Sequence, residues 1–498
     1  MPVEPNADGP DLALGDRARV ALWALPPLVA IVAGVLHGTH FIDDAFITFR
    51  YAENLAAGRG LVFNPGAPVL GTTTPLFAMV LAALKTVGLA VPTAASGLGL
   101  LSMAGVVVLL QLLARRAVSL PVAAAMALCV ALHPDTAFMA TSGMETAASL
   151  GLVIGGLLLA LDGRWLLAGG VGGAAMLMRP DGVLVVALAV GLALLKDRAS
   201  AWKPALTAAV VSVPWALYAA ATYGSPLPHS IKAKKLIHAT AFGDVLRGHV
   251  GLLTQNAPLT ILLALGVVGF VFAVLRRSEL FFVALWMGAY FGSLAVSGIA
   301  PQFAWYATPL TVTGVVLAAY GLDQAAALVP SRSRWLRPGA PIAVLLGIAA
   351  LGLAGDNWRT FRTDLEHREA AYHEIGAWIA ERAQPGDVVF VGEVGVLCYE
   401  LLDQVLVDSS GINSPEIFAL RQAEYDGMLA DDPETATPEG TWRWVQQAID
   451  DLEPDYVVTK YPWLHIGRIE DSAGFQALYE RTGPDNIMLI EYRVYARR

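Results

Sequence analysis

Two adjacent aspartates, Asp43 and Asp44, directly follow the first long apolar segment of the chain. Placing charged groups beside a membrane segment costs free energy, so an adjacent pair of carboxylates indicates a chemical function. An aspartate can act as a general base and accept the proton of an attacking hydroxyl. The pair can also favour the start of a helix near Ala45, because acidic groups stabilise helix N-termini. Consecutive helical residues point about 100° apart, so we expect different roles for the two carboxylates.

Further polar and aromatic residues stand between the apolar runs, and we take them as candidate substrate-binding residues. They are Arg50, Tyr51, His133, Glu145, Arg179, Asp181, His229, Lys232, Lys234, Lys235, Trp305 and Tyr306. Cations can hold a leaving phosphate, and aromatic rings can stack on sugar faces. With a carboxylate base, this set would suit the transfer of a sugar from a lipid phosphate to a hydroxyl group.

Each candidate also has a purely structural explanation. Glu145 can begin a helix, and Arg179 can be an anchor at the membrane interface. The three lysines can form a solvated face. The two aromatics can belong to the interfacial belt, and the histidines can be hydrogen-bonded loop residues.

The composition predicts a membrane protein. Apolar residues make up 56% of the chain and charged residues 15%, whereas a soluble chain has about 25% charged residues. The mean hydropathy is +0.56. The net charge of −9 and the lack of a basic tail do not favour nucleic-acid binding. Cys129 and Cys398 have neither metal-ligand nor disulfide-framework spacing.

Apolar run lengths and the positive-inside rule predict about 11 spans. We place them at residues 20–38, 96–114, 118–133, 146–161, 165–178, 183–195, 205–222, 257–275, 280–298, 308–328 and 340–355. The loops assigned to the inside then contain Arg115 and Arg116, Arg164, Lys196, Arg198 and Lys203, Arg276 and Arg277, and Arg332, Arg334 and Arg337. One apolar run, 76–92, is left over, and we expect it to lie along the outer surface or to dip into the bilayer.

Three regions follow from this topology. Residues 1–19 form a cytoplasmic tail, and 20–355 form a transmembrane domain whose first outer loop is 39–95. Residues 356–498 form a small α/β domain outside the membrane, with strands expected at 388–391, 404–408, 456–459 and 487–495. Gly392-Glu-Val-Gly395 follows the first of these strands, but it lacks the third glycine of a dinucleotide fingerprint.

The stretch from Asp43 to Gly66 resembles the first outer loop of bacterial GT-C glycosyltransferases. The acid pair, Phe49-Arg-Tyr51 and the turn Gly60-Leu-Val-Phe-Asn-Pro-Gly66 occur in the family's order. Later motifs agree, namely Gly143-Met-Glu-Thr-Ala147, Arg179-Pro-Asp-Gly182, Tyr223-Gly-Ser-Pro-Leu-Pro228 with the lysines after it, and the segments 391–399 and 407–411. The branch that it resembles most is that of actinobacterial cell-wall arabinofuranosyltransferases. Protein O-mannosyltransferases and the lipid A aminoarabinose transferase are more distant.

This resemblance implies a GT-C fold and an aspartate base, for which we prefer Asp44 although the motif does not distinguish it from Asp43. It implies a polyprenyl-phosphate sugar donor and an envelope glycan, glycolipid or protein as acceptor. The sugar could be a pentose such as arabinofuranose. The active site and the C-terminal domain would lie on the periplasmic side of a bacterial plasma membrane, and some relatives use Mg²⁺, Mn²⁺ or Ca²⁺ whereas others need no metal.

Two segments depart from the family. Gly71-Thr-Thr-Thr-Pro-Leu-Phe77 replaces a Gly-Tyr-Thr-Asn-Pro-Leu-Trp sequence, and Trp305-Tyr-Ala-Thr-Pro309 lacks the arginine that often precedes the tyrosine. Other functions stay open: a transporter or flippase of lipid-linked saccharides, a GT-C enzyme with a lipid or protein acceptor, or a structural subunit of an envelope complex. A transporter predicts inverted repeats and polar groups near the bilayer midplane, and we find no internal repeat in the sequence.

Overall fold

The structure is a computed structural model that describes residues 14–237, 242–254, 257–298, 303–329, 336–354, 357–431, 440–460, 463–484, 486–487 and 490–498. Most of the predicted cytoplasmic tail, together with Arg332 and Arg334, falls outside these ranges. The chain divides into two compact units. The first comprises Met1–His40, Ala95–Pro214 and Thr240–Trp358, and the second comprises Phe41–Ala94, Trp215–Ala239 and Arg359–Arg498.

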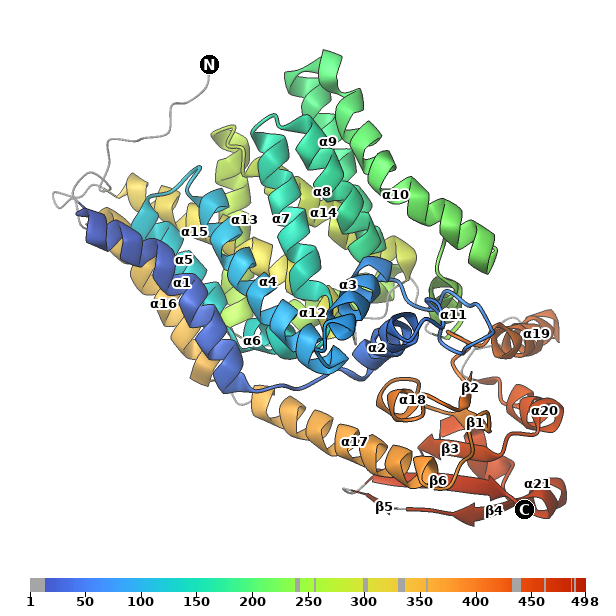
Figure 1. Cartoon of the computed structure of the whole chain (residues 1–498). Coiled ribbons are helices and arrows are strands. Elements are labelled where there is room, and N and C mark those ends of the chain that lie inside the picture. The colour runs from blue at the N-terminus through green and yellow to red at the C-terminus, as the bar shows by residue number, and fades with distance from the viewer. Residues whose placement is uncertain are drawn as a thin grey trace. The chain divides into compact units, whose positions relative to one another are not determined.

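In the first unit, the regular secondary structure of the described residues consists of helices joined by turns and short loops. Its helices are α1 (Asp16–His37), α4 (Val91–Ala114), α5 (Leu120–Leu132), α6 (Pro134–Thr141), α7 (Thr146–Leu161), α8 (Trp165–Met178), η2 (Pro180–Gly182), α9 (Val183–Lys196), η3 (Arg198–Ser200), α10 (Trp202–Tyr223), α12 (Phe242–Thr254), α13 (Ala257–Leu275), α14 (Phe281–Ser297), η4 (Ala304–Tyr306), α15 (Thr308–Leu328) and α16 (Leu336–Ala354). Helices α7, α8 and α9 pack together, as do α13 and α15 (Figure 1).

Every apolar run that we predicted to span the membrane is a helix, but the count of 11 spans is not confirmed. Among the described residues, five helices are long and apolar enough to cross a membrane, and the pair α5 and α6, bent by 62°, would be a sixth. Helices α7 and α8 have 16 and 14 residues. At 1.5 Å per residue they reach only about 21–24 Å, short of a hydrocarbon core of about 30 Å.

Ion pairs join four of the loops that the charge pattern assigns to one side. Arg116 after α4 bonds to Asp162 after α7 at 2.7 Å. It also bonds to Glu279 after α13 at 2.8 Å. Lys196 at the end of α9 bonds to the same Glu279 at 3.0 Å. These loops therefore meet at one end of the helices, as the predicted topology requires.

Glycines let two helices of this unit approach closely. A Cβ on Gly269 of α13 would lie 1.9 Å from the carbonyl oxygen of Leu317, and one on Gly321 of α15 would lie 2.7 Å from the nitrogen of Gly269. Membrane helices gain packing contacts where small residues meet in this way. The two helices are thus fixed against each other beside the cavity described below.

The second unit combines helices with a mixed sheet, which confirms the predicted small α/β domain. Its helices are α2 (Asp43–Ala56), α3 (Pro75–Thr86), α11 (His229–Ile237), α17 (Asn357–Ala380), α18 (Val396–Glu400), α19 (Pro415–Asp431), α20 (Arg443–Leu452), η6 (Trp463–Arg468) and α21 (Ala473–Leu478). Its strands are β1 (Val388–Val391), β2 (Val405–Asp408), β3 (Tyr456–Lys460), β4 (Tyr479–Thr482), β5 (Asn486–Ile487) and β6 (Ile490–Arg497).

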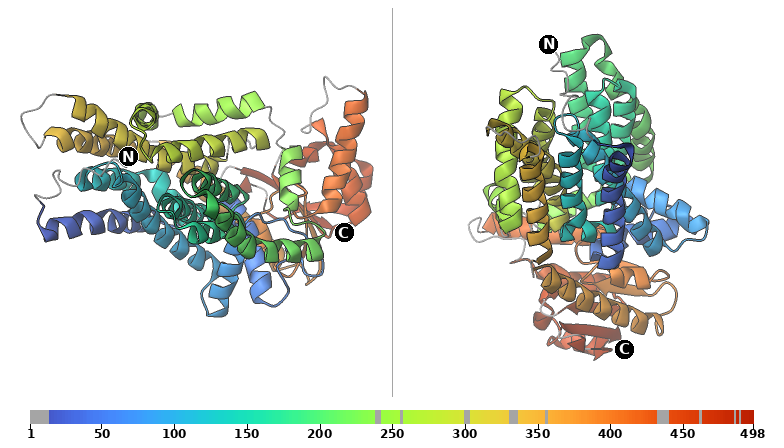
Figure 2. Two further views of the ribbon diagram at one scale, coloured as in Figure 1. Left: turned by 90° about the horizontal axis from the view of Figure 1, so that it is seen from above. Right: turned by 90° about the vertical axis from the view of Figure 1, so that its left-hand side faces the viewer.

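The sheet runs in the order β2-β1-β3-β6-β4, and β5 pairs with β6. Strand β1 is parallel to both β2 and β3, whereas β6 is antiparallel to β3 and β4. Helices α19 and α20 lie beside the sheet (Figures 1 and 2), and Ile417 and Trp444 of these helices share a core with Phe390 of β1. This packing fixes the carboxyl ends of the parallel strands.

The leftover apolar run 76–92 is split between two helices. Helix α3 has 12 residues and ends at Thr86, and Gly88 then takes a φ of +96° before α4 begins at Val91. Twelve residues span only about 18 Å, too short to cross a bilayer. This length agrees with a segment that lies along the surface or dips into it.

Candidate functional site

Asp43 and Asp44 form the first turn of α2, and they have different surroundings. Asp43 is buried, and its Oδ1 accepts a hydrogen bond from the N–H of Val396 at 2.9 Å. Asp44 is half-buried, and its Oδ2 is 2.9 Å from Nζ of Lys234 on α11. The two carboxylates therefore have different partners, one a backbone N–H group and the other a cation.

The loop between β1 and α18 closes over Asp43. A Cβ on Gly395 would lie 2.2 Å from Cγ of Asp43, so only glycine allows this approach. Burial raises the pKa of Asp43 to about 6, while the N–H of Val396 acts in the opposite direction. Burial and the charge of Asp43 raise the pKa of Glu393, in the same loop, to about 7. From the sequence we weighed this loop as a nucleotide motif and as part of the family resemblance, but we did not select Glu393 as a site residue.

Arg50 is fully buried in this unit, and all five of its N–H groups have acceptors. The acceptors are the carbonyl oxygens of Phe63 (2.7 Å), Cys398 (2.6 Å), Leu401 (2.7 Å) and Gln404 (3.0 Å) and Oδ1 of Asn64 (3.3 Å). Its guanidinium also lies 4.9 Å from the centre of the Phe63 ring. This geometry argues against the expected substrate contact, because it leaves the side chain no N–H group for a phosphate.

Tyr51 is also buried and holds a turn in place. Its hydroxyl lies 2.7 Å from the carbonyl oxygen of Val69 and 3.0 Å from Oδ1 of Asn413, and it accepts the N–H of Gly71 at 2.7 Å. A Cβ on Gly71 would lie 1.9 Å from Oδ1 of Asn413. These contacts give Tyr51 a positional role rather than the expected substrate contact.

Helix α11 contains the predicted lysines and His229. Lys232 and Lys235 are exposed, whereas Lys234 is half-buried and pairs with Asp44. The N–H of His229 bonds to the carbonyl oxygen of Leu70 at 2.7 Å, and its ring lies edge-on to Phe418 at 5.1 Å. Burial, and then the charge of Lys232, lower the pKa of His229. Of these four residues, Lys234 is the one that the structure pairs with the aspartate motif.

In the first unit, the predicted residues Glu145, Arg179, Asp181 and Tyr306 come together. Arg179 donates to Glu145 at 3.0 Å and to Asp181 at 3.3 Å, and its guanidinium lies 4.8 Å from the centre of the Tyr306 ring. Arg179 and Glu145 are both buried. These contacts join the loop before α7 with η2 and η4, so the cluster is a polar site at one end of this unit's helices.

The two remaining predicted residues of this unit, Trp305 and His133, have different surroundings. Trp305 is buried against Phe303, with ring centres 5.0 Å apart, and its ring centre lies 5.9 Å from that of Tyr306. His133 lies at the bend between α5 and α6, with Nδ1 3.7 Å from Asp135. Among the described residues, no three His, Cys, Asp or Glu side chains gather as ligands of a metal ion.

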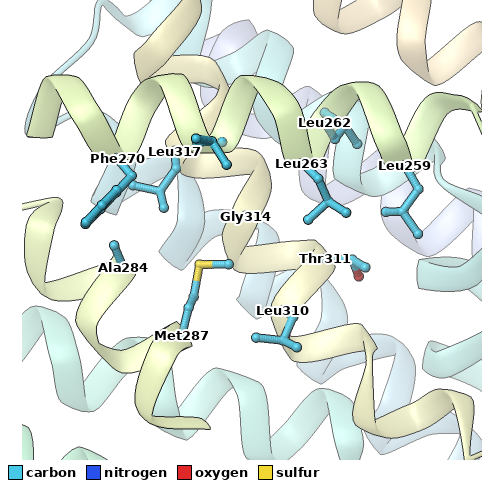
Figure 3. A pocket seen from close by; sticks show the side chains of 12 residues that line it. Leu259, Leu262, Leu263, Phe270, Ala284, Met287, Leu310, Thr311, Gly314 and Leu317 are labelled. Atoms are coloured by element: carbon cyan, nitrogen blue, oxygen red, sulfur yellow. The ribbon is translucent and has the colours of Figure 1, made fainter. Parts of the chain in front are cut away.

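An apolar cavity of about 290 Å³ opens between α13, α14 and α15 (Figure 3). Its lining includes Leu263, Phe270, Met287 and Leu310, with Thr311 as a polar contributor. Leu310 also packs in the cluster that contains Tyr306, the residue under the Arg179 guanidinium. The cavity thus continues into side chains that contact the cation of the polar site.

Three solved structures resemble the whole chain. ArnT from Cupriavidus metallidurans bound to undecaprenyl phosphate is 13% identical, with a TM-score of 0.63, over 96% of this chain and 97% of that one. The oligosaccharyltransferase of Archaeoglobus fulgidus, in a complex with zinc and sulfate, is 12% identical over 93% and 72%, with a TM-score of 0.57. The same enzyme, AglB, with an inhibitory peptide and a dolichol-phosphate, is 12% identical over 89% and 69%, also with a TM-score of 0.57.

Comparisons of the sequence itself add one family match and no curated relative. Residues 357–494 match a family model described as a domain of unknown function, DUF8728. No curated protein has a significantly similar sequence. The family match covers most of the C-terminal part of the second unit, including the loop that closes over Asp43.

Proposed function

We propose that this chain, which has the fold of the GT-C glycosyltransferases, transfers a sugar from a polyprenyl-phosphate donor to a hydroxyl group of a cell-envelope glycan or glycolipid. One observation supports this most: a buried carboxylate, Asp43, adjoins a carboxylate paired with a cation, Asp44 with Lys234. Two similar structures contain undecaprenyl phosphate and dolichol-phosphate, which are donor-type lipids.

Asp43 is the general base in this proposal, in place of Asp44, which we preferred from the sequence. A base works best when its pKa is near the working pH, and burial brings the pKa of Asp43 to about 6. The acceptor oxygen attacks the anomeric carbon while Asp43 takes its proton. The bond from that carbon to the phosphate oxygen breaks, and its electron pair leaves with the polyprenyl phosphate.

Lys234 compensates the charge that develops on the leaving phosphate. Its ammonium group is held by Asp44 at 2.9 Å, so it is already oriented before the donor binds. The exposed Lys232 and Lys235 add positive charge to the same short helix. Arg179 is less suited to this role, because Glu145 and Asp181 already neutralise it.

We propose, from the first unit by itself, that its apolar cavity between α13, α14 and α15 binds an isoprenoid chain. Its side chains are almost all aliphatic or aromatic, which matches an isoprenoid and would not favour a sugar (Figure 3). The size suits a short stretch of the chain, and the rest of the lipid would lie in the bilayer.

The donor sugar and the side of the membrane follow from the resemblance of the first loop. That loop is similar to that of arabinofuranosyltransferases, so we propose a pentose such as arabinofuranose. We further propose that the reaction takes place on the periplasmic side of a bacterial plasma membrane. Nucleotide sugars are absent there, so the donor must be activated by a lipid phosphate.

Purified protein in detergent, given synthetic polyprenyl-phosphate sugars and envelope acceptors, tests the proposal. We expect Asp43→Asn to lower the transfer rate by roughly 10²–10⁴-fold. The exposed Asp403, whose side chain is 64% exposed, provides a control, because Asp403→Asn should keep full activity. Full transfer by Asp43→Asn, Asp44→Asn and the double variant would overturn the catalytic assignment. Lipid-linked sugar that accumulates in a deletion strain would identify the donor.

A further inference from the structure

The loop between β1 and α18 occupies a special position in the sheet. Strand β1 is central to the parallel part, with β2 on one side and β3 on the other. The chain therefore runs from β1 to its neighbour β2 and later returns to β3, on the other side of β1. In open α/β sheets, the carboxyl end of the strands at such a reversal is where ligands bind. Glu393 lies in this loop, two residues before the glycine that contacts Asp43.

Glu393 belongs to a group of buried polar atoms that lack hydrogen-bond partners within the described part of the chain. They are Oε1 of Glu393, the hydroxyls of Tyr372 and Tyr492, and Nε of Arg368. The two tyrosine rings meet edge to face, with centres 5.5 Å apart. Buried polar groups are nearly always hydrogen-bonded, so such a group indicates a function or a proton held between its members.

Several charges face Glu393 from the elements packed around it. Asp43 of α2 contributes a negative charge, and Arg368 of α17 and Lys460 of β3 contribute positive ones. Tyr372 of α17 also faces Glu393, and the ring of Tyr492 of β6 adjoins that of Tyr372. Asp43 in turn faces Asp44 and Arg368 and lies near the Cys398 thiol. Two carboxyl groups in one buried, partly compensated site resist being charged together.

We propose that Glu393 is a positioning residue that shares one proton with Asp43, so that the pair carries a single negative charge in the working enzyme. This inference rests on the proposed function of Asp43 as the base. The negative charge stays on Asp43, because the N–H of Val396 binds its Oδ1 at 2.9 Å. Glu393 keeps the proton beside the two tyrosine hydroxyls.

The arrangement has a chemical consequence for the transfer of the sugar. When Asp43 takes the acceptor proton, both acids are neutral and the departing phosphate meets no carboxylate charge from this pair. One proton then leaves to solvent and restores the starting state. If Glu393 also loses its proton, two negative charges face the anionic donor, and the donor binds less well. The rate should therefore rise with the first ionisation and fall with the second.

Transfer rates of the full chain from about pH 5 to about pH 9 test this inference. We expect kcat/KM of the wild type to rise near pH 6 and to fall again above about pH 7. In Glu393→Gln, kcat/KM should still rise near pH 6, but its fall above about pH 7 should be at least tenfold smaller than in the wild type. Glu393→Asp should restore both the rise and the fall. Glu400→Gln is the matched control, since Glu400 lies on α18 and bonds to His373 instead. It should leave the wild-type profile unchanged.

Two results would overturn the inference: an unchanged pH profile in Glu393→Gln, or a rate lowered equally at every pH, which a merely structural role would produce.

An infrared titration gives a second readout that needs no activity. A protonated carboxyl band should persist at neutral pH in the wild type, be lost in Glu393→Gln and titrate at lower pH in Asp43→Asn. If the band behaves so but Asp43→Asn transfers sugar normally, the proposed function fails while the shared proton stands. If the band is missing but Asp43→Asn is inactive, the base stands and the shared proton does not.

Discussion

Replacing Arg50 by lysine distinguishes a residue that holds the fold from one that binds the donor. The guanidinium donates to five buried acceptors that belong to the first outer loop and to the segment from α18 to β2. A lysine has three N–H groups on one nitrogen, so at least two acceptors lose their partner. Each buried acceptor without a partner costs about 1–3 kcal/mol, and we therefore expect Arg50→Lys to destabilise the protein by about 2–6 kcal/mol.

Thermal unfolding in detergent at a fixed scan rate measures this effect. A loss of 2 kcal/mol or more should lower the Tm by at least about 2 °C, because a chain of 498 residues has a large entropy of unfolding. Arg59→Lys is the matched control, because Arg59 is on the same loop and is 40% exposed, and its side chain makes a surface pair with Asp403 and one long hydrogen bond of 3.4 Å to Oδ1 of Asn54. A surface pair contributes at most about 1 kcal/mol, so the control should unfold close to the wild type.

The KM for the donor distinguishes a structural role of Arg50 from phosphate binding. If Arg50 holds the fold, the folded fraction of Arg50→Lys at low temperature should keep a wild-type KM for the lipid-phosphate sugar. If the variant is instead as stable as the wild type and its KM for the donor rises tenfold, Arg50 contacts the phosphate. The assignment from buried hydrogen bonds would then be wrong, and the interpretation from the sequence would be right.

Three further predictions concern the aspartate motif. Gly395→Ala puts a Cβ 2.2 Å from Cγ of Asp43 and should lower transfer at least tenfold, whereas Gly427→Ala, in open space, should not. Lys234→Met should raise the KM for the donor and change stability by only about 1 kcal/mol, because the pair with Asp44 is partly exposed to solvent. The effect should not add to that of Asp44→Asn. The folded-state pKa of Asp43 is raised from 3.8 to about 6, so the stability it confers is present below about pH 4 and lost as pH rises through 6. Asp43→Asn should therefore raise the free energy of unfolding at pH 8, by on the order of 3 kcal/mol at most, and should leave it unchanged below pH 4.

The helices of the first unit could be predicted from the sequence because each is a bounded apolar run. The predicted limits 146–161, 165–178, 257–275 and 308–328 are the observed limits of α7, α8, α13 and α15. Hydropathy marks where a helix is buried in apolar surroundings, but it does not say whether the helix crosses the bilayer. The count of 11 spans is not confirmed, because helices of 14–17 residues match the hydropathy pattern but are shorter than a membrane span.

The candidate site was harder to predict, because its partners come from far along the chain. Adjacency alone identified Asp43 and Asp44, but Val396, which lies 353 residues after Asp43, has no local signal that pairs it with α2. We predicted Arg50 as a ligand because we treated each charge outside the membrane as a possible substrate contact, and its five buried acceptors argue against that prediction. The sequence did contain a warning: Phe46, Phe49 and Tyr51 surround Arg50, and a helix that is apolar on several sides is buried.

The C-terminal domain is part of the proposed active site and not an addition to it. Its β1–α18 loop supplies the N–H group that binds Asp43, the glycine that lets the loop approach and the second acid, Glu393. The segment from α18 to β2 also supplies three of the carbonyl oxygens that bind Arg50. A chain cut before residue 357 would lose all of these partners at once and leave Arg50 with two of its five acceptors, the carbonyl oxygen of Phe63 and Oδ1 of Asn64. In this chain, the segment 357–494 that matches the domain of unknown function therefore contacts helix α2 and buries its first aspartate.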